Sequence, residues 1–262
     1  MRKTFRAENN KDYWTNRWDK IDADEVMQNS NTYPLKYAIE ALKFNNNNQK
    51  ILEAGCGAGR ILNYLHQKNL DVVGIEFIQN AVNKIKKKFP NTKVKVMDIL
   101  NTDFKNNEFD LILAFGLYHN FEFDNLEKSL IETKRILKTN GILCFSFRAD
   151  NVQNLILDKI KQNKNLNIKN NKFHKLNLNK TEILGLLKNH KFEVLKHYYV
   201  TNMPLLFHFK FFRSSNQKQF DEHVGRKEGY QLNFFGRILN RFLMFFFKKQ
   251  YCNIHVFFCK NT

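Results

Sequence analysis

Short apolar runs alternate with amphipathic segments over the first two thirds of the chain. Five of these runs predict buried strands, at residues 51–54, 71–75, 93–97, 109–115 and 141–147. After the first run, Ile61, Leu62 and Leu65 recur at helical spacing. A strand that alternates with a helix is typical of a parallel sheet with helices on both faces. The fold class is therefore α/β.

The same pattern continues toward the C-terminus. Apolar positions with helical spacing predict helices over 124–137, 151–168 and 181–189, and Gly141 suits the stop of the first of them. Residues 192–200 and 254–260 predict two more strands. The expected sheet therefore has seven strands.

Three glycines, Gly55, Gly57 and Gly59, separate the first strand from the first helix. Glycine tolerates positive φ and lets a ligand approach the backbone, and the N–H groups of a new helix point at such a ligand. The spacing differs from the dinucleotide fingerprint because the third glycine comes one place early, and the Gly-Lys-Ser/Thr of a phosphate loop is absent. The turn therefore predicts a different ligand.

An acidic residue stands at or next to the end of each of the first three strands: Glu53, Glu76 and Asp98. Glu76 follows the glycines at roughly the 20-residue distance at which doubly wound folds place a carboxylate on a ribose. Glu53, just before the glycines, suits a ligand that carries an amine. We expect the three carboxylates to line one crevice.

The pattern Glu-x-Gly-x-Gly-x-Gly at 53–59 resembles the first motif of the class I S-adenosylmethionine (SAM)-dependent methyltransferases, and Arg-x-Leu-Lys at 135–138 resembles their run before strand five. The resemblance implies a Rossmann-like, doubly wound sheet that is mostly parallel, with an antiparallel last strand between strands five and six. It implies SAM as cofactor. The cofactor-binding residues that it implies are Glu53, Gly55, Gly57, Glu76, Phe77, Asp98, Ile99 and Phe115.

Tyr118 and His119 follow the fourth strand, where the transferred methyl group should emerge. Both are catalytic candidates, and His119 is the better base because imidazole titrates near neutrality. A structural hydrogen bond is the alternative role for His119. No metal is expected: Asp150 and Asn151 resemble half of a divalent-metal site, but the other half is missing after the fourth strand.

The segment 115–120 resembles the small-molecule and lipid branch of the family, the methyltransferase type 11 and quinone-biosynthesis-like enzymes. This implies methyl transfer by in-line displacement to a small-molecule or lipid-like acceptor, with an oxygen favoured as acceptor atom. Two alternatives stay open: an RNA-modifying methyltransferase, and a non-catalytic subunit with a SAM-binding fold.

The formal net charge is +18. It indicates either an anionic partner or a composition rich in Lys, Asn, Ile and Phe, and we favour composition, so nucleic acid is not the expected partner. No secretory signal is visible, the longest apolar run (242–247) is too short to span a bilayer, and the four cysteines lack zinc spacing. We therefore expect a cytoplasmic protein, and attachment to the inner face of the membrane is an open alternative.

Three parts are expected along the chain. Residues 1–30 form an N-terminal lid segment in which Tyr13, Trp14 and Trp18 share helical spacing. Residues 31–200 and 251–262 form the SAM-binding domain, and 201–250 form an inserted cap. Whether the aromatic residues of the first segment close over a cofactor or only dock it to the core stays open, as does the oligomeric state.

The cap holds an amphipathic segment, residues 234–249, with an apolar face and a basic stripe. Three roles are open for it: packing as core or lid, forming a wall of the substrate site, or peripheral contact with a membrane. Upstream, residues 207–213 alternate aromatic with basic side chains, a pattern that suits a surface, a lid or the stacking of nucleic-acid bases.

Overall fold

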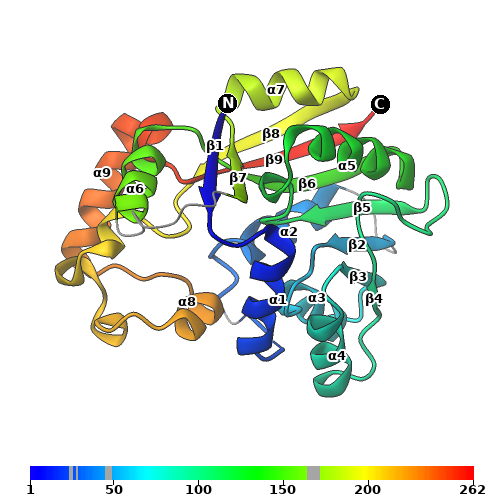
Figure 1. Cartoon of the computed structure of the whole chain (residues 1–262), viewed down its shortest axis with the longest axis horizontal. Coiled ribbons are helices and arrows are strands. Elements are labelled where there is room, and N and C mark those ends of the chain that lie inside the picture. Colours follow the sequence, from blue (N-terminus) through cyan, green and yellow to red (C-terminus); the bar gives the residue numbers. More distant parts are fainter. Residues whose placement is uncertain (24–25, 28, 45–48, 164–171) are drawn as a thin grey trace.

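Seven strands form one sheet in the computed structural model, which describes residues 1–23, 26–27, 29–44, 49–163 and 172–262 (Figure 1). Their order is β4-β3-β2-β5-β6-β9-β8. The strands are β2 (Ile51–Ala54), β3 (Val72–Glu76), β4 (Val94–Val96), β5 (Phe109–Ala114), β6 (Leu137–Arg148), β8 (Phe192–Val200) and β9 (Ile254–Asn261). Strands β2 to β6 run parallel, and β9 lies antiparallel between β6 and β8. The predicted seven-stranded sheet with an antiparallel last strand is confirmed.

Helices cover both faces of this sheet (Figure 1). Within β5, Leu111 and Leu113 pack with one helical layer and Ile112 packs with the other, because successive side chains of a strand point to opposite faces. The first layer consists of α2 (Leu35–Ala41), α3 (Arg60–Gln67) and α4 (Gln79–Lys88). The second consists of α5 (Phe123–Ile136) and α7 (Lys180–Asn189). The sheet is thus doubly wound.

The junction between α5 and β6 differs from the prediction. We expected the helix to include residue 137 and to stop at Gly141, but it ends at Ile136 and β6 begins at once with Leu137. Between Leu137 and Ile142 the pairing with β5 shifts in register. Asn140 there has a φ of 65°. The turn residues before the fifth strand therefore form a bulge inside a long strand.

The other predicted helices are present. The helix expected at 181–189 is α7, which begins with a capping box formed by Asn179 and Glu182. The helix expected at 151–168 is α6 (Val152–Asn163), and its predicted end falls outside the described residues.

A small second sheet was not predicted. Strand β1 (Arg2–Arg6) pairs antiparallel with β7 (Lys172–Asn177). The two strands are polar and lie about 170 residues apart in the chain, so neither shows the apolar run or the nearby partner that marks a strand in sequence. This pairing fixes the start of the chain, and the helix that follows, α1 (Asn10–Lys20), contacts α4 and β7.

The cap (residues 201–250) connects β8 to β9 and consists of short helical turns and two helices. The two helices are α8 (Glu222–Glu228) and α9 (Phe234–Tyr251), and α9 lies beside α6 at one end of the molecule (Figure 1). The turns in the cap are η3 (Leu205–His208), η4 (Lys210–Phe212) and η5 (Ser215–Gln217), and η1 (Leu42–Phe44) and η2 (Tyr118–Asn120) lie earlier in the chain. One face of α9, with Leu239 and Leu243, packs on a small apolar cluster of the cap.

Candidate active site

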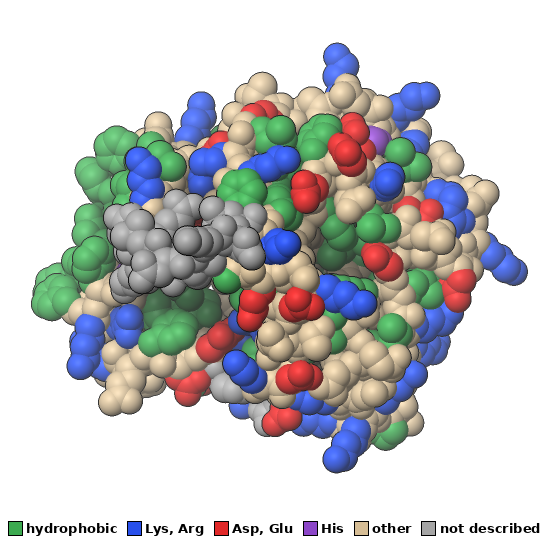
Figure 2. All heavy atoms as spheres, viewed as in Figure 1, with side chains coloured by type: hydrophobic (Ala, Val, Ile, Leu, Met, Phe, Trp, Pro, Cys, Tyr) green, Lys and Arg blue, Asp and Glu red, His purple; other side chains and the backbone are tan. Residues whose placement is uncertain are grey.

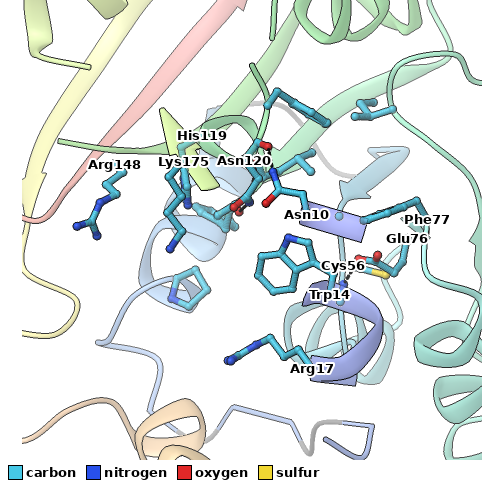
Figure 3. Close-up of a pocket in the computed structure, with 18 of the residues that line it drawn as sticks. Asn10, Trp14, Arg17, Cys56, Glu76, Phe77, His119, Asn120, Arg148 and Lys175 are labelled. Carbon is cyan, nitrogen blue, oxygen red and sulfur yellow. Dashed lines mark hydrogen bonds between the residues drawn. The ribbon is translucent and has the colours of Figure 1, made fainter. Parts of the chain in front are cut away.

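A cavity of about 760 Å³ lies at the carboxyl ends of the parallel strands, where open α/β sheets bind ligands. Its lining includes residues that end or follow β2, β3, β4, β5 and β6, together with residues of α1 and β7. Figure 3 shows its side chains converging on one space from these separate elements. The cavity is therefore the meeting point of the strand ends, α1 and the second sheet.

The glycine turn forms the floor of this cavity. Gly55, Gly57 and Gly59 have φ values of 69°, 56° and 86°, in the left-handed region that disfavours other residues. A Cβ built at Gly57 would lie 2.7 Å from Cζ2 of Trp18, and one at Gly55 would lie 2.9 Å from Cδ1 of Leu117. The turn needs glycine both for its backbone conformation and for the close approach of other groups.

Glu76, the last residue of β3, holds the glycine turn in place. Its Oε2 accepts a hydrogen bond of 3.0 Å from the Gly57 backbone N–H, and its Oε1 accepts one of 3.1 Å from the backbone N–H of Ile78. Burial raises the pKa of Glu76 to about 7, and these backbone donors partly oppose the rise. Each oxygen keeps a lone pair for a ligand donor in the cavity.

The other two strand-end acids also line the cavity. Glu53 is buried near the end of β2, and Asp98 lies exposed just after β4, where its Oδ1 accepts a 3.0 Å hydrogen bond from the backbone N–H of Leu100. The structure thus brings Glu53, Glu76 and Asp98 into one cavity, as expected. That they bind a cofactor stays a prediction.

Apolar side chains border the acids. Phe77, Ile99 and Phe115, all predicted from the family resemblance, line the cavity. The Phe115 ring meets the Tyr33 ring edge to face, with centroids 5.9 Å apart, and the Tyr33 hydroxyl shares a 2.8 Å hydrogen bond with Oγ of Ser146. Sequence analysis missed Tyr33, since its position before α2 carries no motif.

His119 lies at the opposite side of the cavity from Glu76 (Figure 3). Its Nδ1 is buried and has no hydrogen-bond partner among the described residues. Burial lowers the pKa of His119 well below the usual value, and the positive charges of Lys175 and Arg148 lower it further. The imidazole is therefore neutral at pH 7 and a weak base. It can offer a ligand a ring nitrogen that donates or accepts a hydrogen bond.

Tyr118 does not reach the cavity, in contrast to the prediction. It is fully buried in the core, and its hydroxyl shares a 2.7 Å hydrogen bond with Oγ1 of Thr133 on α5. Burial also raises the pKa of Tyr118. The two residues after the fourth strand therefore separate: His119 faces the cavity and Tyr118 anchors the loop, so we assign Tyr118 no catalytic role.

Two basic residues that sequence analysis did not select stand near His119. Arg148 ends β6 and lines the cavity, and its guanidinium donates to Oδ1 of Asp158 at 2.7 Å and to Oδ1 of Asn177 at 2.6 Å. Lys175 comes from β7 and also lines the cavity (Figure 3). Because β7 was not recognised as a strand, no signal in the sequence could place Lys175 here.

Helix α1 closes one side of the cavity. Trp14 and Trp18 stack with ring centroids 5.6 Å apart, and Asn10 donates a 2.5 Å hydrogen bond to the backbone oxygen of Asn120. Arg17 forms an ion pair with Glu222 of α8. The N-terminal segment is thus tied both to the loop after β5 and to the cap, and its role as a lid stays a prediction.

Among the residues that the structure describes, no group of three or more His, Cys, Asp or Glu side chains could hold a metal ion. Asp150 bonds to Nε of Arg2 at 2.8 Å. The Asn151 side chain donates to the backbone oxygen of Lys249 and accepts from the backbone N–H of Asn154, both at 3.1 Å. The half-site suggested by the sequence is therefore part of the scaffold.

Comparison with known proteins points to one family. Residues 52–145 match the family described as a methyltransferase domain, and this segment runs from β2 into β6 and contains the glycine turn and all three acids. A tRNA (guanine-N(7)-)-methyltransferase of Clostridium botulinum is 36% identical over 95 residues, which cover 34% of this chain and 40% of that protein. The chain spans only 26% and 40% of the length of the first two curated relatives that it matches.

Solved structures share the fold over most of the chain. A SAM-dependent methyltransferase of Methanosarcina mazei has a TM-score of 0.57 and 15% identity, covering 87% of this chain and 97% of that one. The 1,6-didemethyltoxoflavin-N1-methyltransferase of Burkholderia thailandensis, solved with bound 1,6-didemethyltoxoflavin and S-adenosylhomocysteine, has a TM-score of 0.52 and 12% identity, covering 88% of this chain and 77% of that one. At these identities the likeness concerns the fold.

Proposed function

We propose that this protein transfers a methyl group from SAM to an acceptor held in the same cavity, because residues 52–145 match the methyltransferase-domain family and the chain shares the fold of a SAM-dependent methyltransferase. One observation carries the proposal: the glycine turn and the carboxylates of Glu53, Glu76 and Asp98, from three adjacent strands, line a single cavity. A fold by itself does not identify a reaction. The residues gathered in this cavity give stronger support for methyl transfer than the fold does.

The residues present fit SAM. Glu76, with a lone pair left on each oxygen, suits the two ribose hydroxyls, and Asp98 suits the adenine amino group, with Phe77 and Ile99 beside it to pack on the ring. The buried carboxyl group of Glu53 suits the positively charged end of the ligand. SAM supplies a methyl group on a sulfonium that becomes neutral as the methyl leaves.

The protein's part in such a transfer is to align the acceptor and exclude water, and alignment alone is worth up to roughly 10 kcal/mol. Trp14 and Trp18 of α1 line the cavity, and as part of a lid they would restrict water there. Neutral His119 offers a hydrogen bond to an acceptor hydroxyl or amine and so orients it. Because His119 is a weak base, an acceptor that loses its proton readily suits this site.

We propose a small-molecule or lipid-like acceptor, with an oxygen as the favoured acceptor atom. The acceptor side of the cavity is partly closed by Met203 and His208 of the cap and by Ile254 at the start of β9. Leu117 and Phe121 also line the cavity. This wall combines apolar surface with a few polar groups, the usual lining of a small-molecule site. None of the described cavity-lining residues belongs to α9, so this helix does not form the substrate wall.

Calorimetric titration with SAM and with S-adenosylhomocysteine tests the proposal. We expect saturable binding of both, and we expect Glu76→Gln to weaken it by about 1–3 kcal/mol, the cost of a mismatched buried polar group. Glu193→Gln is the matched control, since Glu193 is half exposed on β8 and its Oε2 pairs with Nζ of Lys260 at 3.0 Å. If neither ligand produces a heat of binding at millimolar concentration, the proposed function is rejected.

RNA methylation is a second candidate. It is favoured by the net charge of +18 and by the similarity to a tRNA (guanine-N(7)-)-methyltransferase, although that similarity covers only 40% of the other protein. Binding of tRNA through several phosphates would weaken steeply with salt, whereas a small-molecule enzyme shows no such dependence. A filter-binding titration with tRNA distinguishes the two candidate functions. It covers roughly 50 to 200 mM salt, the range in which the affinity of a protein for nucleic acid falls steeply.

A non-catalytic subunit is the remaining alternative. The glycine turn and the three acids are all in place, which gives it little support. It would be favoured if the protein binds SAM while a broad acceptor screen with labelled SAM yields no methylated product.

A further inference from the structure

Helix α9 carries a row of exposed apolar side chains. At 3.6 residues per turn, six of them fall within one third of the helix circumference. They form what we call the outer face of α9: Phe234, Phe235, Ile238, Phe242, Phe245 and Phe246. Their side chains are between 51% and 77% exposed, so this face contributes little to the core. The opposite face, with Gly236, Leu239 and Leu243, supplies the packing onto the cap.

The apolar row continues beyond the helix. Phe209 and Phe211, around η4, are 56% and 67% exposed. They lie close to the start of α9, because the Asn233 side chain donates a 2.6 Å hydrogen bond to the backbone oxygen of Phe211. Figure 2 shows hydrophobic side chains gathered at the end of the molecule that Figure 1 assigns to α9. Soluble proteins rarely expose so continuous an apolar surface without a partner.

Basic residues flank this face. Arg237 and Arg241 fall along one border of the row, and Lys248 and Lys249 follow its end, after a kink at Phe247; all four are exposed. The sequence from residue 229 to residue 262 contains no Asp or Glu. An aromatic face bordered by cations, with no acidic residue, matches the chemistry of an anionic lipid surface, whose headgroups attract the cations while the acyl boundary accepts the rings.

A second copy of this chain fits the face less well. Two outer faces packed together would bring Arg237, Arg241 and Lys248 of each copy close to those of the other, and like charges at short range repel. Helix α9 also does not cross a bilayer: among the described residues, no helix combines sufficient length with sufficient apolar character for that.

We propose that the outer face of α9, together with Phe209 and Phe211, docks the protein on the surface of an anionic lipid bilayer, with the helix lying in the plane of the interface. This goes beyond the proposed methyl transfer and does not depend on it, because no described residue of α9 lines the cavity.

Co-sedimentation of the full chain with vesicles tests the proposal. We expect strong binding to phosphatidylglycerol–phosphatidylcholine vesicles and weak binding to phosphatidylcholine alone. The double variant Phe242→Ser/Phe245→Ser should lower the partition coefficient at least about tenfold, since two buried rings are lost. Ile131→Ser is the matched control, because Ile131 is an apolar side chain with 59% exposure on α5, outside this face. We expect it to bind as the parent protein does.

A charge series separates the electrostatic part. Arg237→Gln/Arg241→Gln should weaken binding to the anionic vesicles by about fivefold for each charge removed, whereas Lys86→Gln/Lys87→Gln on α4 should have little effect. Circular dichroism and SAM titration of every variant check folding and keep this result separate from the fate of the proposed function.

Three outcomes would overturn the proposal. The first is equal binding by the parent protein and the Phe242→Ser/Phe245→Ser variant. The second is binding that does not depend on phosphatidylglycerol. The third is failure to bind either vesicle, with sedimentation equilibrium showing a dimer that the same double variant dissolves, since the face would then belong to a contact between two copies.

Discussion

The two halves of the cavity are built in different ways. The half that we propose for the cofactor, the cofactor half, consists of Glu53, the glycine turn, Glu76 and Asp98, which lie within 50 residues of chain, each at or next to a strand end. The acceptor half combines α1, the loop after β5, β7 and part of the cap. Neighbouring strands of one sheet hold the first half, whereas contacts between segments far apart in the chain hold the second.

The two halves also differ in charge. Carboxylates line the cofactor half, and Arg148 and Lys175 stand on the acceptor half beside His119. A site that binds one fixed ligand and one variable ligand can be built in this way, because the rigid sheet edge holds the first and exchangeable segments shape the second. Changes in the cofactor half should therefore cost most, and changes in the contacts of α1 should cost least.

The largest effect is expected at Gly57. A Cβ there would collide with Trp18 at 2.7 Å and would have to adopt a φ of 56°, so Gly57→Val should weaken SAM binding at least about 100-fold. Gly185→Ala on α7 is the control, since the added Cβ would meet no other part of the chain within 4 Å beyond the backbone of its own helix. Calorimetry with SAM measures both. Unchanged affinity in Gly57→Val would mean that the turn does not hold the cofactor.

The next effect concerns the pKa of Glu76. This pKa is about 7 in the folded protein and near 4.5 when unfolded, so the native state binds the proton more tightly. The contribution of Glu76 to the free energy of unfolding is therefore largest at low pH. It decreases as the pH rises from 4.5 to 7 and does not change further above pH 7.

Relative to Glu76→Gln, the parent protein should lose on the order of 2–3 kcal/mol between pH 4.5 and pH 8. Urea unfolding of both proteins without ligand, across this range, provides the measurement. Parallel pH curves for the two proteins would show that burial does not perturb this carboxyl group.

A smaller effect of pH is expected at His119 on the acceptor side, where the ring should not titrate near neutrality. Because burial and the nearby cations lower its pKa well below the usual value, His119 should stay neutral between pH 8 and pH 6. Nuclear magnetic resonance of the ring protons follows the titration of His119. The variants His119→Glu and His119→Gln serve only to assign its signal. A midpoint near 6.5 would instead indicate a ring open to solvent and able to act as an ordinary base.

The smallest effect is expected where α1 meets the cap. Arg17→Ala removes the ion pair with Glu222, and a partly exposed pair of this kind is worth about 0.2–1 kcal/mol. SAM should then dissociate up to about fivefold faster, which stopped-flow fluorescence of Trp14 and Trp18 can follow. Lys20→Ala, at the exposed end of α1, is the control. Equal SAM dissociation rates in the parent protein and both variants would show that α1 does not act as a lid.

Local sequence predicted the main sheet well. The runs that became β2, β3, β5, β8 and β9 are dense in apolar residues, and burial in a sheet requires that density. The junction at Leu137 was mispredicted because a helical spacing that ended at Ile136 continued by chance into a strand. Strands β1 and β7 were missed because their stability comes from pairing with each other and not from their own composition.

The sequence by itself determined the cofactor half, since a strand end, a turn and an acid a few residues apart can be placed by local geometry. Only the tertiary structure decided that His119 faces the cavity while Tyr118 turns into the core, that Lys175 stands beside His119, and that the outer face of α9 is left exposed. These outcomes depend on which distant segments meet. Long-range packing sets such contacts, and no short stretch of residues carries them.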